Sequence, residues 1–331
     1  MATSLVTGGA GFMGAHVTRE LLDRGHAVVV LDDLSGGFQD QVDARATFVH
    51  GSITDHELVD RLFDEHGFTY VYHLAAYAAE GLSHFIRRFN YTNNLIGSIN
   101  LINASVRHDV KCFVFTSSIA VYGALRPPMR EDMHPVPEDP YGVAKLAVEM
   151  DLYAARHMFG LDFVVFRPHN VYGEYQNLGD RYRNVVGIFM NQLMQGKALT
   201  IFGDGTQQRA FTYVADIAPI IARAAETPAA FGEVFNIGAD TPYTVNQLAD
   251  AVMGAMGMKG EVHHLEARNE VAFAFSDHSK VQRVFGPQEE TTLADGLARM
   301  TPWAKAAGAR KSGAFGAIEI ARGLPPSWSV A

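Results

Sequence analysis

The sequence lacks several features that would assign it to a specialised class of protein. Its 331 residues include one cysteine, Cys112, which excludes an internal disulfide and, at the start of an apolar segment, predicts a buried structural thiol. Lys and Arg number 27 against 36 Asp and Glu, so there is no excess of positive charge to attract nucleic acid. No apolar run is as long as a membrane span, and the N-terminus shows no signal-peptide pattern. We therefore expect a cytoplasmic protein without nucleic-acid or membrane partners.

The 14 histidines do not predict a metal site. His263 and His264 are adjacent in a predicted strand, so their side chains face opposite sides. Four others show no metal-ligand spacing with acids or cysteine: His50, His56, His66 and His73. We predict that no metal is bound.

Hydrophobic residues make up 48% of the chain and charged residues 19%, which is typical of a globular protein with a large core. Up to about residue 167, strand-like and helix-like segments alternate, which predicts an α/β fold with a Rossmann-like doubly wound parallel sheet. The expected strands are 3–7, 27–31, 46–50, 70–75, 111–117 and 162–167, and the expected helices are 12–24, 55–66, 84–108 and 141–158.

After Arg167 this regular alternation ends. Short strands (198–202, 210–214, 234–237 and 261–265) mix with helices near 185–195, 216–226 and 245–256. We predict a Rossmann domain over 1–167, with helices up to about 180 included. A smaller mixed α/β substrate lobe follows over 168–305, with some chain returning to the Rossmann domain. The Gly-, Ala- and Pro-rich tail over 306–331 is expected to be loosely ordered.

A glycine-rich run joins the first expected strand to the first expected helix: Thr7-Gly8-Gly9-Ala10-Gly11-Phe12-Met13-Gly14. A dinucleotide pyrophosphate binds at such a helix N-terminus, where glycines permit a tight turn and close approach of the backbone. The second strand ends in Asp32-Asp33. An acid there accepts hydrogen bonds from the adenosine ribose, which favours NAD over NADP. A glycine turn without a ligand and a helix-capping aspartate are the alternatives.

Tyr141 and Lys145 are four residues apart in an expected helix, so their side chains share one face. A lysine ammonium, helped by a positively charged nicotinamide, lowers the pKa of a phenol towards neutrality, and the tyrosinate is then a general base. Such pairs also occur by chance on solvated helices. The preceding strand ends in Thr116-Ser117-Ser118, which favours catalysis because parallel-sheet sites lie at the carboxyl ends of strands.

These residues and several further motifs resemble the extended short-chain dehydrogenase/reductase family, in particular its UDP-glucose 4-epimerase-like sugar-nucleotide epimerases. The resemblance covers roughly residues 3 to 300. The further motifs are LDDLS, His73-Leu74-Ala75-Ala76, SSIAVYG, YGVAK, Arg167-Pro168-His169-Asn170-Val171-Tyr172-Gly173 and Ile201-Phe202-Gly203-Asp204-Gly205-Thr206. The resemblance implies bound NAD, a UDP-sugar substrate and epimerisation at C4 through a transient 4-keto sugar.

The resemblance also implies roles for individual residues. Ser118, Tyr141 and Lys145 are the implied catalytic residues. The implied NAD-binding residues are Gly8, Gly11, Phe12, Met13, Gly14, Asp32, Asp33, Leu34, Ser35, Gly36, Ser52, Ile53, Leu74, Ala75, Ala76, Asn93, Ser117, Tyr141, Lys145 and His169. The implied substrate-binding residues are Ser118, Tyr141, Asn170, Asn184, Val185, Thr200, Ile201, Phe202, Arg209, Phe211, Arg268 and Glu270.

The residues after Ser118 help to choose the reaction. The related 4,6-dehydratases have an Asp-Glu pair there and the related decarboxylases usually have a Glu, whereas this chain has Ile119-Ala120, which cannot transfer protons. Epimerisation of UDP-glucose/UDP-galactose, or of UDP-glucuronate or a UDP-N-acetylhexosamine, is therefore the leading hypothesis. A dehydratase or reductase of the same family is one alternative, and an inactive fold that senses cofactor or scaffolds a partner is the other.

The chain departs from the family pattern at several positions. Ser52 replaces an Asp that binds adenine, and Ala210 replaces another Asp. The stretch after Arg268 is one residue short, so the sugar gate, which is bulky for hexoses and small where N-acetyl sugars pass, falls on Ala274 or Phe275.

The largest departure is the segment 77–88, where Ala78 removes a polar contact and Glu80 adds a charge. Two interpretations are open: the added charges are solvated on a loop and helix face, or Glu80 or Ser83 contacts the sugar. The loop 174–183 carries two arginines. We expect them either to bind a phosphate or a sugar carboxylate, or to be exposed loop charges.

The resemblance further implies a homodimer through helices 84–108 and 141–158. In the second helix, Leu146, Met150, Tyr153 and His157 form an i, i+4, i+7, i+11 stripe. This stripe faces either a partner or the chain's own sheet.

Overall fold

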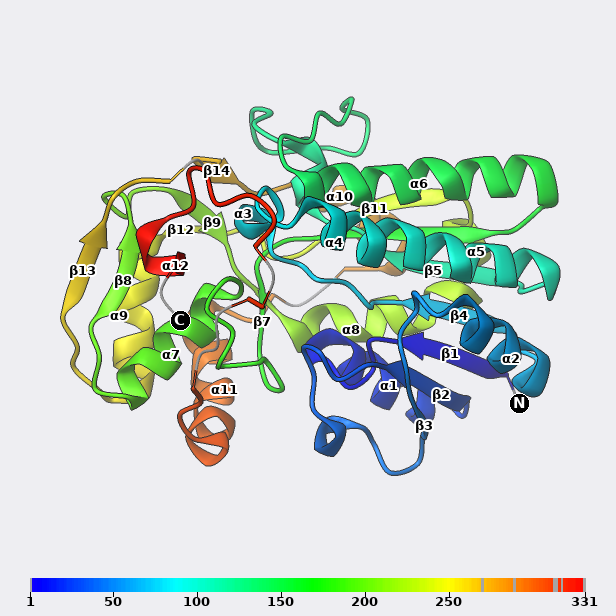
Figure 1. The fold of residues 1–331 in the computed structure, drawn as a ribbon, viewed down its shortest axis with the longest axis horizontal. Coiled ribbons are helices and arrows are strands. Elements are labelled where there is room, and N and C mark those ends of the chain that lie inside the picture. Colours follow the sequence, from blue (N-terminus) through cyan, green and yellow to red (C-terminus); the bar gives the residue numbers. More distant parts are fainter. Residues whose placement is uncertain (1, 269–270, 288–289, 312–314, 317, 330–331) are drawn as a thin grey trace.

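The computed structural model describes residues 2–268, 271–287, 290–311, 315–316 and 318–329. Figure 1 shows a larger domain built on a central sheet and a smaller lobe beside it. The sheet has seven strands in the order β11-β6-β5-β4-β1-β2-β3, and all of its neighbouring pairs are parallel. The strands are β1 (Thr3–Thr7), β2 (Ala27–Asp32), β3 (Thr47–His50), β4 (Tyr70–His73), β5 (Cys112–Thr116), β6 (Phe163–Pro168) and β11 (Glu233–Ile237).

The register of the central strands brings their carboxyl ends to one edge. Thr7 at the end of β1 is paired with Leu31 on one side and with His73 on the other. The strand order reverses between β1 and β4, which is where ligands bind in doubly wound sheets. The predicted fold class is confirmed.

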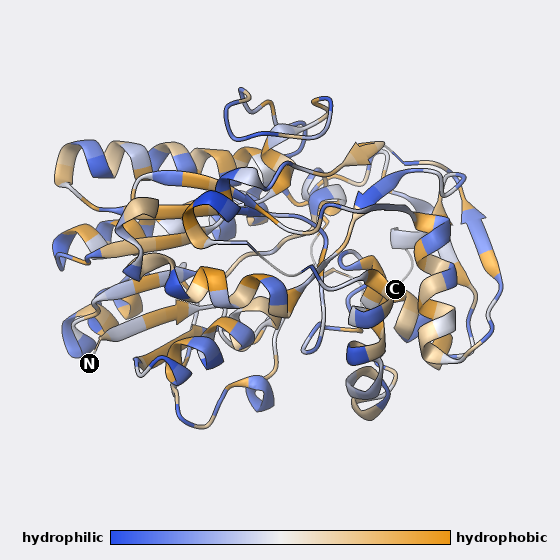
Figure 2. Cartoon of the chain, turned by 180° about the vertical axis from the view of Figure 1, so that it is seen from behind, coloured by the Kyte–Doolittle hydropathy of each residue, from blue (hydrophilic) through white to orange (hydrophobic). Residues whose placement is uncertain are grey.

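Helices cover both faces of this sheet, and the strands are therefore rich in apolar residues along their whole length. Figure 2 shows the hydrophobic strands between helices with mixed surfaces. One face packs against α1 (Phe12–Asp23), α8 (Val214–Arg223) and α10 (Ser279–Phe285). The other packs against α2 (His56–His66), α5 (Gly97–Arg107) and α6 (Pro140–Phe159). Asp139 caps α6, because its carboxylate accepts a hydrogen bond from the Gly142 amide at 2.9 Å.

The predicted single helix 84–108 is divided in the structure. The chain forms α3 (Glu80–Ser83), α4 (Arg87–Tyr91), a π-helical turn over Thr92–Ile96 and then α5. The side chain of Asn94 on this turn accepts a hydrogen bond from the Tyr77 amide and donates one to the Tyr77 carbonyl, at 2.8 and 3.1 Å. The π-helical turn thus links the helix to the loop that follows β4.

The smaller lobe has its own core between three helices and short strands. The helices are α7 (Val185–Met194), α9 (Val245–Met256) and α11 (Leu293–Ala307). The strands are β7 (Val171–Tyr172) with β10 (Thr212–Tyr213), β8 (Leu199–Phe202) with β13 (Val262–Leu265), and β9 (Gln208–Ala210) between β12 (Pro242–Thr244) and β14 (Phe273–Ala274). Of the elements expected after Arg167, strand 234–237 and helix 216–226 return to the central sheet as β11 and α8.

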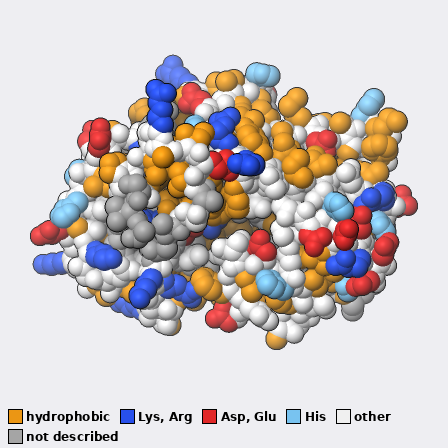
Figure 3. All heavy atoms as spheres, in the orientation of Figure 1, with side chains coloured by type: hydrophobic (Ala, Val, Ile, Leu, Met, Phe, Trp, Pro, Cys, Tyr) orange, Lys and Arg blue, Asp and Glu red, His pale blue; other side chains and the backbone are white. Residues whose placement is uncertain are grey.

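Part of the tail that composition predicts to be loosely ordered packs on the rest of the molecule, through Phe315, Ile318, Leu324 and Trp328. It ends in the short helix α12 (Pro326–Ser329), where the Trp328 side chain is 5% exposed among aromatic residues of other segments. Figure 3 shows Lys and Arg side chains interspersed with Asp and Glu over one face of the molecule. Among the described residues, no helix is long and apolar enough to cross a membrane.

Candidate active site

A cavity of about 520 Å³ lies at the carboxyl edge of the central sheet, and its lining comes from both the Rossmann domain and the lobe. The glycine turn after β1 forms one end. Gly8 adopts a φ of +74°, and a Cβ placed on Gly14 would lie 2.1 Å from the Gly8 carbonyl oxygen. Side chains are therefore excluded from the turn, which leaves the backbone open to a phosphate group at the N-terminus of α1.

Asp32, at the end of β2, holds this turn in place. Its carboxylate accepts hydrogen bonds from the Ala10 amide at 3.0 Å and from the Leu34 amide at 2.8 Å. Burial raises the pKa of Asp32, and these hydrogen bonds oppose the rise. Asp32 and Asp33 both line the cavity, whereas Leu34, with a φ of +60°, is not among the described lining residues. Leu34 instead supports the turn through its amide.

The three implied catalytic residues lie together on the cavity wall. Ser118 follows β5, and Tyr141 and Lys145 lie in the first turns of α6. The Lys145 ammonium donates a hydrogen bond to the Thr116 carbonyl at 2.8 Å and lies 5.8 Å from the centre of the Tyr141 ring. The end of β5 therefore fixes the lysine behind the tyrosine.

Burial controls the titration of this pair. It raises the pKa of Tyr141 well above its usual value, and a hydrogen bond with Ser118 opposes the rise. It lowers the pKa of Lys145 to about 7, and the charge of Glu149 opposes this fall. The protein alone thus keeps Tyr141 protonated. The lowered tyrosine pKa predicted from the sequence depends on the positively charged nicotinamide that the prediction included.

A buried ion pair that the sequence analysis did not identify stands behind the lysine. Glu149, 2% exposed and one turn after Lys145, accepts a hydrogen bond from the Ser117 hydroxyl at 2.5 Å and pairs with Arg167 at 2.5 Å. Three successive residues at and just after the end of β5 therefore form hydrogen bonds with three successive turns of α6. Ser118 is bonded to Tyr141, the Thr116 carbonyl to Lys145 and the Ser117 hydroxyl to Glu149. The spacing of Tyr141, Lys145 and Glu149 is the signal that was available for finding this arrangement.

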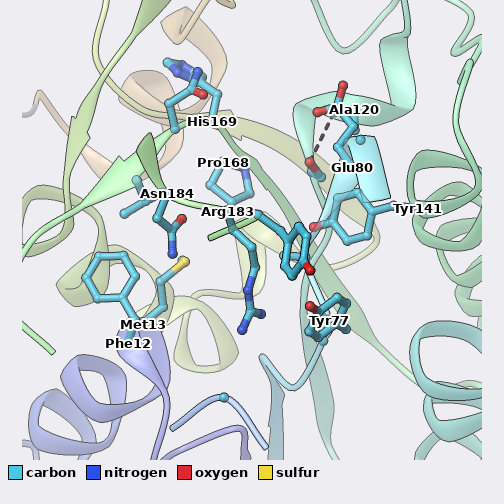
Figure 4. A pocket seen from close by; sticks show the side chains of 18 of the residues that line it. Phe12, Met13, Tyr77, Glu80, Ala120, Tyr141, Pro168, His169, Arg183 and Asn184 are labelled. Atoms are coloured by element: carbon cyan, nitrogen blue, oxygen red, sulfur yellow. Dashed lines mark hydrogen bonds between the residues drawn. The ribbon is translucent and has the colours of Figure 1, made fainter. Parts of the chain in front are cut away.

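Most residues with an implied NAD- or substrate-binding role line this one cavity. With the exception of Leu34, all of the described residues implied to bind NAD do so, and so do all of those implied to bind substrate. Glu270 lies outside the described residues. Arg209 and Arg268 line the cavity from the lobe. Figure 4 shows Phe12 and Met13 beside Asn184, with Tyr141 and Glu80 across the pocket.

The cavity also includes the segments in which this chain departs from the family. Ala274 lines it, whereas Phe275 is not among the described lining residues. Glu80 lines it, as do Arg181 and Arg183 of the loop 174–183. Arg183 pairs with Asp180 at 2.5 Å and lies 4.5 Å from the centre of the Tyr77 ring, a residue that the sequence analysis did not assign to the site.

The described residues contain no group of three or more His, Cys, Asp or Glu side chains that could hold a metal ion. Cys112 is buried, and burial raises the pKa of its thiol. The glycine turn and the apolar wall of Phe12, Met13 and Ile53 fit a dinucleotide.

Comparison with known proteins places this architecture in a family. The model of the NAD-dependent epimerase/dehydratase family matches residues 4–238. The UDP-glucose 4-epimerase of Mycolicibacterium smegmatis is 34% identical over 304 residues, which are 89% of this chain and 96% of that protein. The crystal structure of Thermotoga maritima UDP-glucose 4-epimerase with UDP-glucose has a TM-score of 0.88 at 35% identity and covers 92% of this chain and 99% of its own.

A structure with a different sugar is also similar. The UDP-glucuronic acid 4-epimerase of Bacillus cereus, in complex with UDP-glucuronic acid and NAD, has a TM-score of 0.84 at 28% identity and covers 92% of this chain. This chain belongs to the NAD-dependent epimerase/dehydratase family, among the extended short-chain dehydrogenases/reductases that resemble UDP-glucose 4-epimerase.

Proposed function

We propose that this protein inverts C4 of a UDP-sugar and keeps its NAD bound between turnovers. The observation that carries the proposal is the convergence of Ser118, Tyr141 and Lys145 on the cavity that also contains the glycine turn and the lobe arginines. Hydride chemistry needs the cofactor, the reacting carbon and a proton acceptor within one site, and this cavity provides a place for each.

The roles of the side chains follow from their positions. The glycine turn and Asp32 would hold NAD, which would accept the hydride from C4 and return it. Tyr141 takes the proton from the 4-hydroxyl, and Ser118 donates a hydrogen bond to the same oxygen as it becomes a ketone. Lys145, fixed on the Thr116 carbonyl, stabilises the tyrosinate by its charge. Arg209 and Arg268 hold the diphosphate while the sugar turns over.

The same wall disfavours elimination of water. Ile119 and Ala120 line the cavity beside Ser118 and offer no group that moves a proton. A dehydratase needs an acid and a base at these positions, in addition to the oxidation at C4. Epimerisation needs only the groups that are present.

The lining also favours particular sugars. We propose an uncharged hexose or N-acetylhexosamine, because Ala274 leaves room for an N-acetyl group at the gate. Glu80 near Tyr141 opposes a sugar carboxylate, whereas the nearby Arg183 is already paired with Asp180 and lies over the Tyr77 ring.

The test is to incubate the purified protein, without added cofactor, with UDP-glucose, UDP-galactose, UDP-N-acetylglucosamine and UDP-glucuronate in separate reactions. Chromatography with mass detection should show a new peak of unchanged mass from the first three and a much slower change from UDP-glucuronate. A product lighter by one water would instead support the dehydratase. No product from any of them, even with NAD added, would refute the proposal.

Tyr141→Phe tests the assigned base. It should abolish turnover, while the absorbance of the denatured protein's supernatant still reports bound NAD. Tyr70→Phe, at the start of β4 and outside the cavity lining, is the matched control and should leave turnover unchanged. Turnover retained in Tyr141→Phe would overturn the mechanism.

We also propose a homodimer through α5 and α6. On α6, Met150 is 66% exposed and Tyr153 48% exposed, His157 is exposed and Leu146 is half-buried, so most of the stripe faces away from the chain's own sheet. Light scattering should give twice the chain mass for the wild type and a shift to monomer for Met150→Asp. A monomeric wild type would refute this assembly.

A further inference from the structure

The C-terminal tail reaches the substrate end of the cavity. Figure 1 shows it (red) running from the end of α11 past α7 to the region of α3 and α4, with α12 beside the lobe. The Arg310 amide donates to the Asn191 side chain of α7 at 2.8 Å, and the Phe315 amide donates to the Tyr182 hydroxyl at 2.9 Å. The tail is therefore attached to the lobe on its way to the cavity.

The tail is also attached to the Rossmann domain. The Glu319 carboxylate accepts hydrogen bonds from the Arg88 and Phe89 amides at 2.8 and 2.9 Å, where α4 begins. The Phe315 ring lies 4.9 Å from that of Phe89 and 5.2 Å from that of Tyr77. These partners belong to the segment 77–89, which includes the largest departure of this chain from the family pattern. Two unusual parts of the chain thus pack on each other.

Trp328 is the residue through which the tail meets the nucleotide side of the cavity. Its ring lies 5.3 Å from Tyr182 and 6.1 Å from Phe202, and both of these line the cavity. The Arg268 guanidinium lies 4.5 Å from the centre of the Phe202 ring and 5.6 Å from that of Trp328. Two aromatic faces therefore hold the arginine by cation–π attraction.

The backbone of α3 lies against both Trp328 and Arg268. A Cβ on Gly81 of α3 would lie 3.2 Å from the Trp328 ring and 3.7 Å from an Arg268 nitrogen. The Arg181 guanidinium donates to the Ser327 carbonyl next to it. The indole is thus seated among α3, the loop 174–183 and β8, so it has little freedom to move away from Arg268.

We propose that Trp328 is a positioning residue for nucleotide binding, which makes the tail a structural part of the substrate site. It holds Arg268 and Phe202 in place before the substrate arrives, and preorganised groups bind with a smaller entropy loss. The inference rests on the proposed function, because it takes a nucleoside diphosphate as the ligand of Arg268. The Thermotoga maritima enzyme is matched over 99% of its own length but 92% of this chain, so this chain carries additional sequence.

The proposal predicts a specific division of kinetic effects. Trp328→Ala should weaken UDP binding by about tenfold, in keeping with the loss of one desolvated cation–π contact. KM for the UDP-sugar should rise by a similar factor with kcat nearly unchanged, because none of the described tail contacts involves Ser118, Tyr141 or Lys145. Trp328→Phe should restore most of the affinity. Ile320→Ala, an exposed tail position, is the control and should change nothing.

The first measurement is the affinity of the intact protein for UDP by calorimetry, since it does not depend on turnover. No binding of UDP to the wild type would refute the proposed function. If UDP binds to the wild type and to Trp328→Ala with the same affinity, the positioning role alone is refuted. A fall in kcat with unchanged KM would also refute it.

A second measurement does not require Trp328 to be removed. The chain has two tryptophans, so Trp303→Phe leaves Trp328 as the single indole reporter. Acrylamide quenching of the Trp328 emission should be weak both without UDP and at saturating UDP, because the buried indole is held in place before the nucleotide binds. Strong quenching without UDP that falls on saturation would show that the indole is not preorganised and would overturn the proposal.

Discussion

Replacement of Lys145, the lysine to which we assign a catalytic role, is expected to make the folded protein more stable while it destroys activity. Lys145 is buried, and its pKa falls from 10.5 to about 7 on folding. Lys145→Met keeps the length and the apolar stem of the side chain but removes the group that resists burial. The variant therefore avoids the free-energy cost of burying the Lys145 amine, which the wild type has.

The magnitude follows from linkage. Each unit of pKa shift corresponds to about 1.4 kcal/mol, so burial of this amine costs roughly 4 kcal/mol at pH 7. The lost hydrogen bond to the Thr116 carbonyl offsets about 2 kcal/mol of that gain. The net stabilisation is about 2 kcal/mol, or roughly 3 °C in Tm for a chain of this length.

The sign of the pH dependence is fixed by the direction of the shift. The unfolded chain holds the Lys145 proton up to its ordinary pKa of 10.5, whereas the folded chain releases it near pH 7. The unfolded state thus binds more protons between these values, and wild-type stability rises with pH across that window. The advantage of Lys145→Met is complete below about pH 7, shrinks as the pH rises and has vanished by about pH 9.5.

The assay is urea unfolding of both proteins at pH 7 and pH 9.5, with nucleotide removed and its absence checked by absorbance. Lys259→Met, at an exposed position, is the control and should not differ from the wild type at either pH. If Lys145→Met is less stable than the wild type at pH 7, or its advantage persists unchanged at pH 9.5, the burial argument is wrong.

Three further predictions concern other parts of the site. Gly14→Ala should abolish NAD retention, measured by absorbance of the released nucleotide, because its Cβ would lie 2.1 Å from the Gly8 carbonyl; Gly254→Ala, at an open position in α9, should retain NAD and gain about 0.5–1 kcal/mol. Ala274→Tyr should reduce kcat/KM for UDP-N-acetylglucosamine at least tenfold more than for UDP-glucose, and equal losses would exclude Ala274 as the gate. Glu149→Gln should lower the unfolding free energy by about 3 kcal/mol, because it leaves the Arg167 cation buried without its partner; chemical denaturation checks this, and an unchanged midpoint would contradict it.

Local sequence spacing was sufficient to predict the fold class and the cofactor end of the site. A Cβ on Gly14 would lie 2.1 Å from the carbonyl oxygen of Gly8, six residues earlier, and Tyr141 and Lys145 share a helix face through spacing alone. Such features can be recognised in sequence because each depends on short-range geometry.

Features that depend on contacts between distant segments were missed. Glu149 and Arg167 are 18 residues apart and join only because α6 packs on β6 and the end of β5. Asn94 links the π-helical turn to Tyr77 through a conformation that no periodicity indicates. The tail is expected to be loosely ordered because it is rich in Gly, Ala and Pro, whereas Trp328 and Phe315 pack on aromatic residues of distant segments, which composition does not reveal.

The positions of the two chain ends have a practical consequence for anyone who expresses this protein. β1 begins at Thr3, at the edge of the sheet opposite the cavity, so a purification tag fused before it stands far from the ligand. Trp328 lies in α12, the last described helix, and packs beside Phe202 and Arg268 at the cavity. A tag fused at the C-terminus is therefore expected to alter substrate affinity, and kinetic constants from the two kinds of fusion protein should not be pooled.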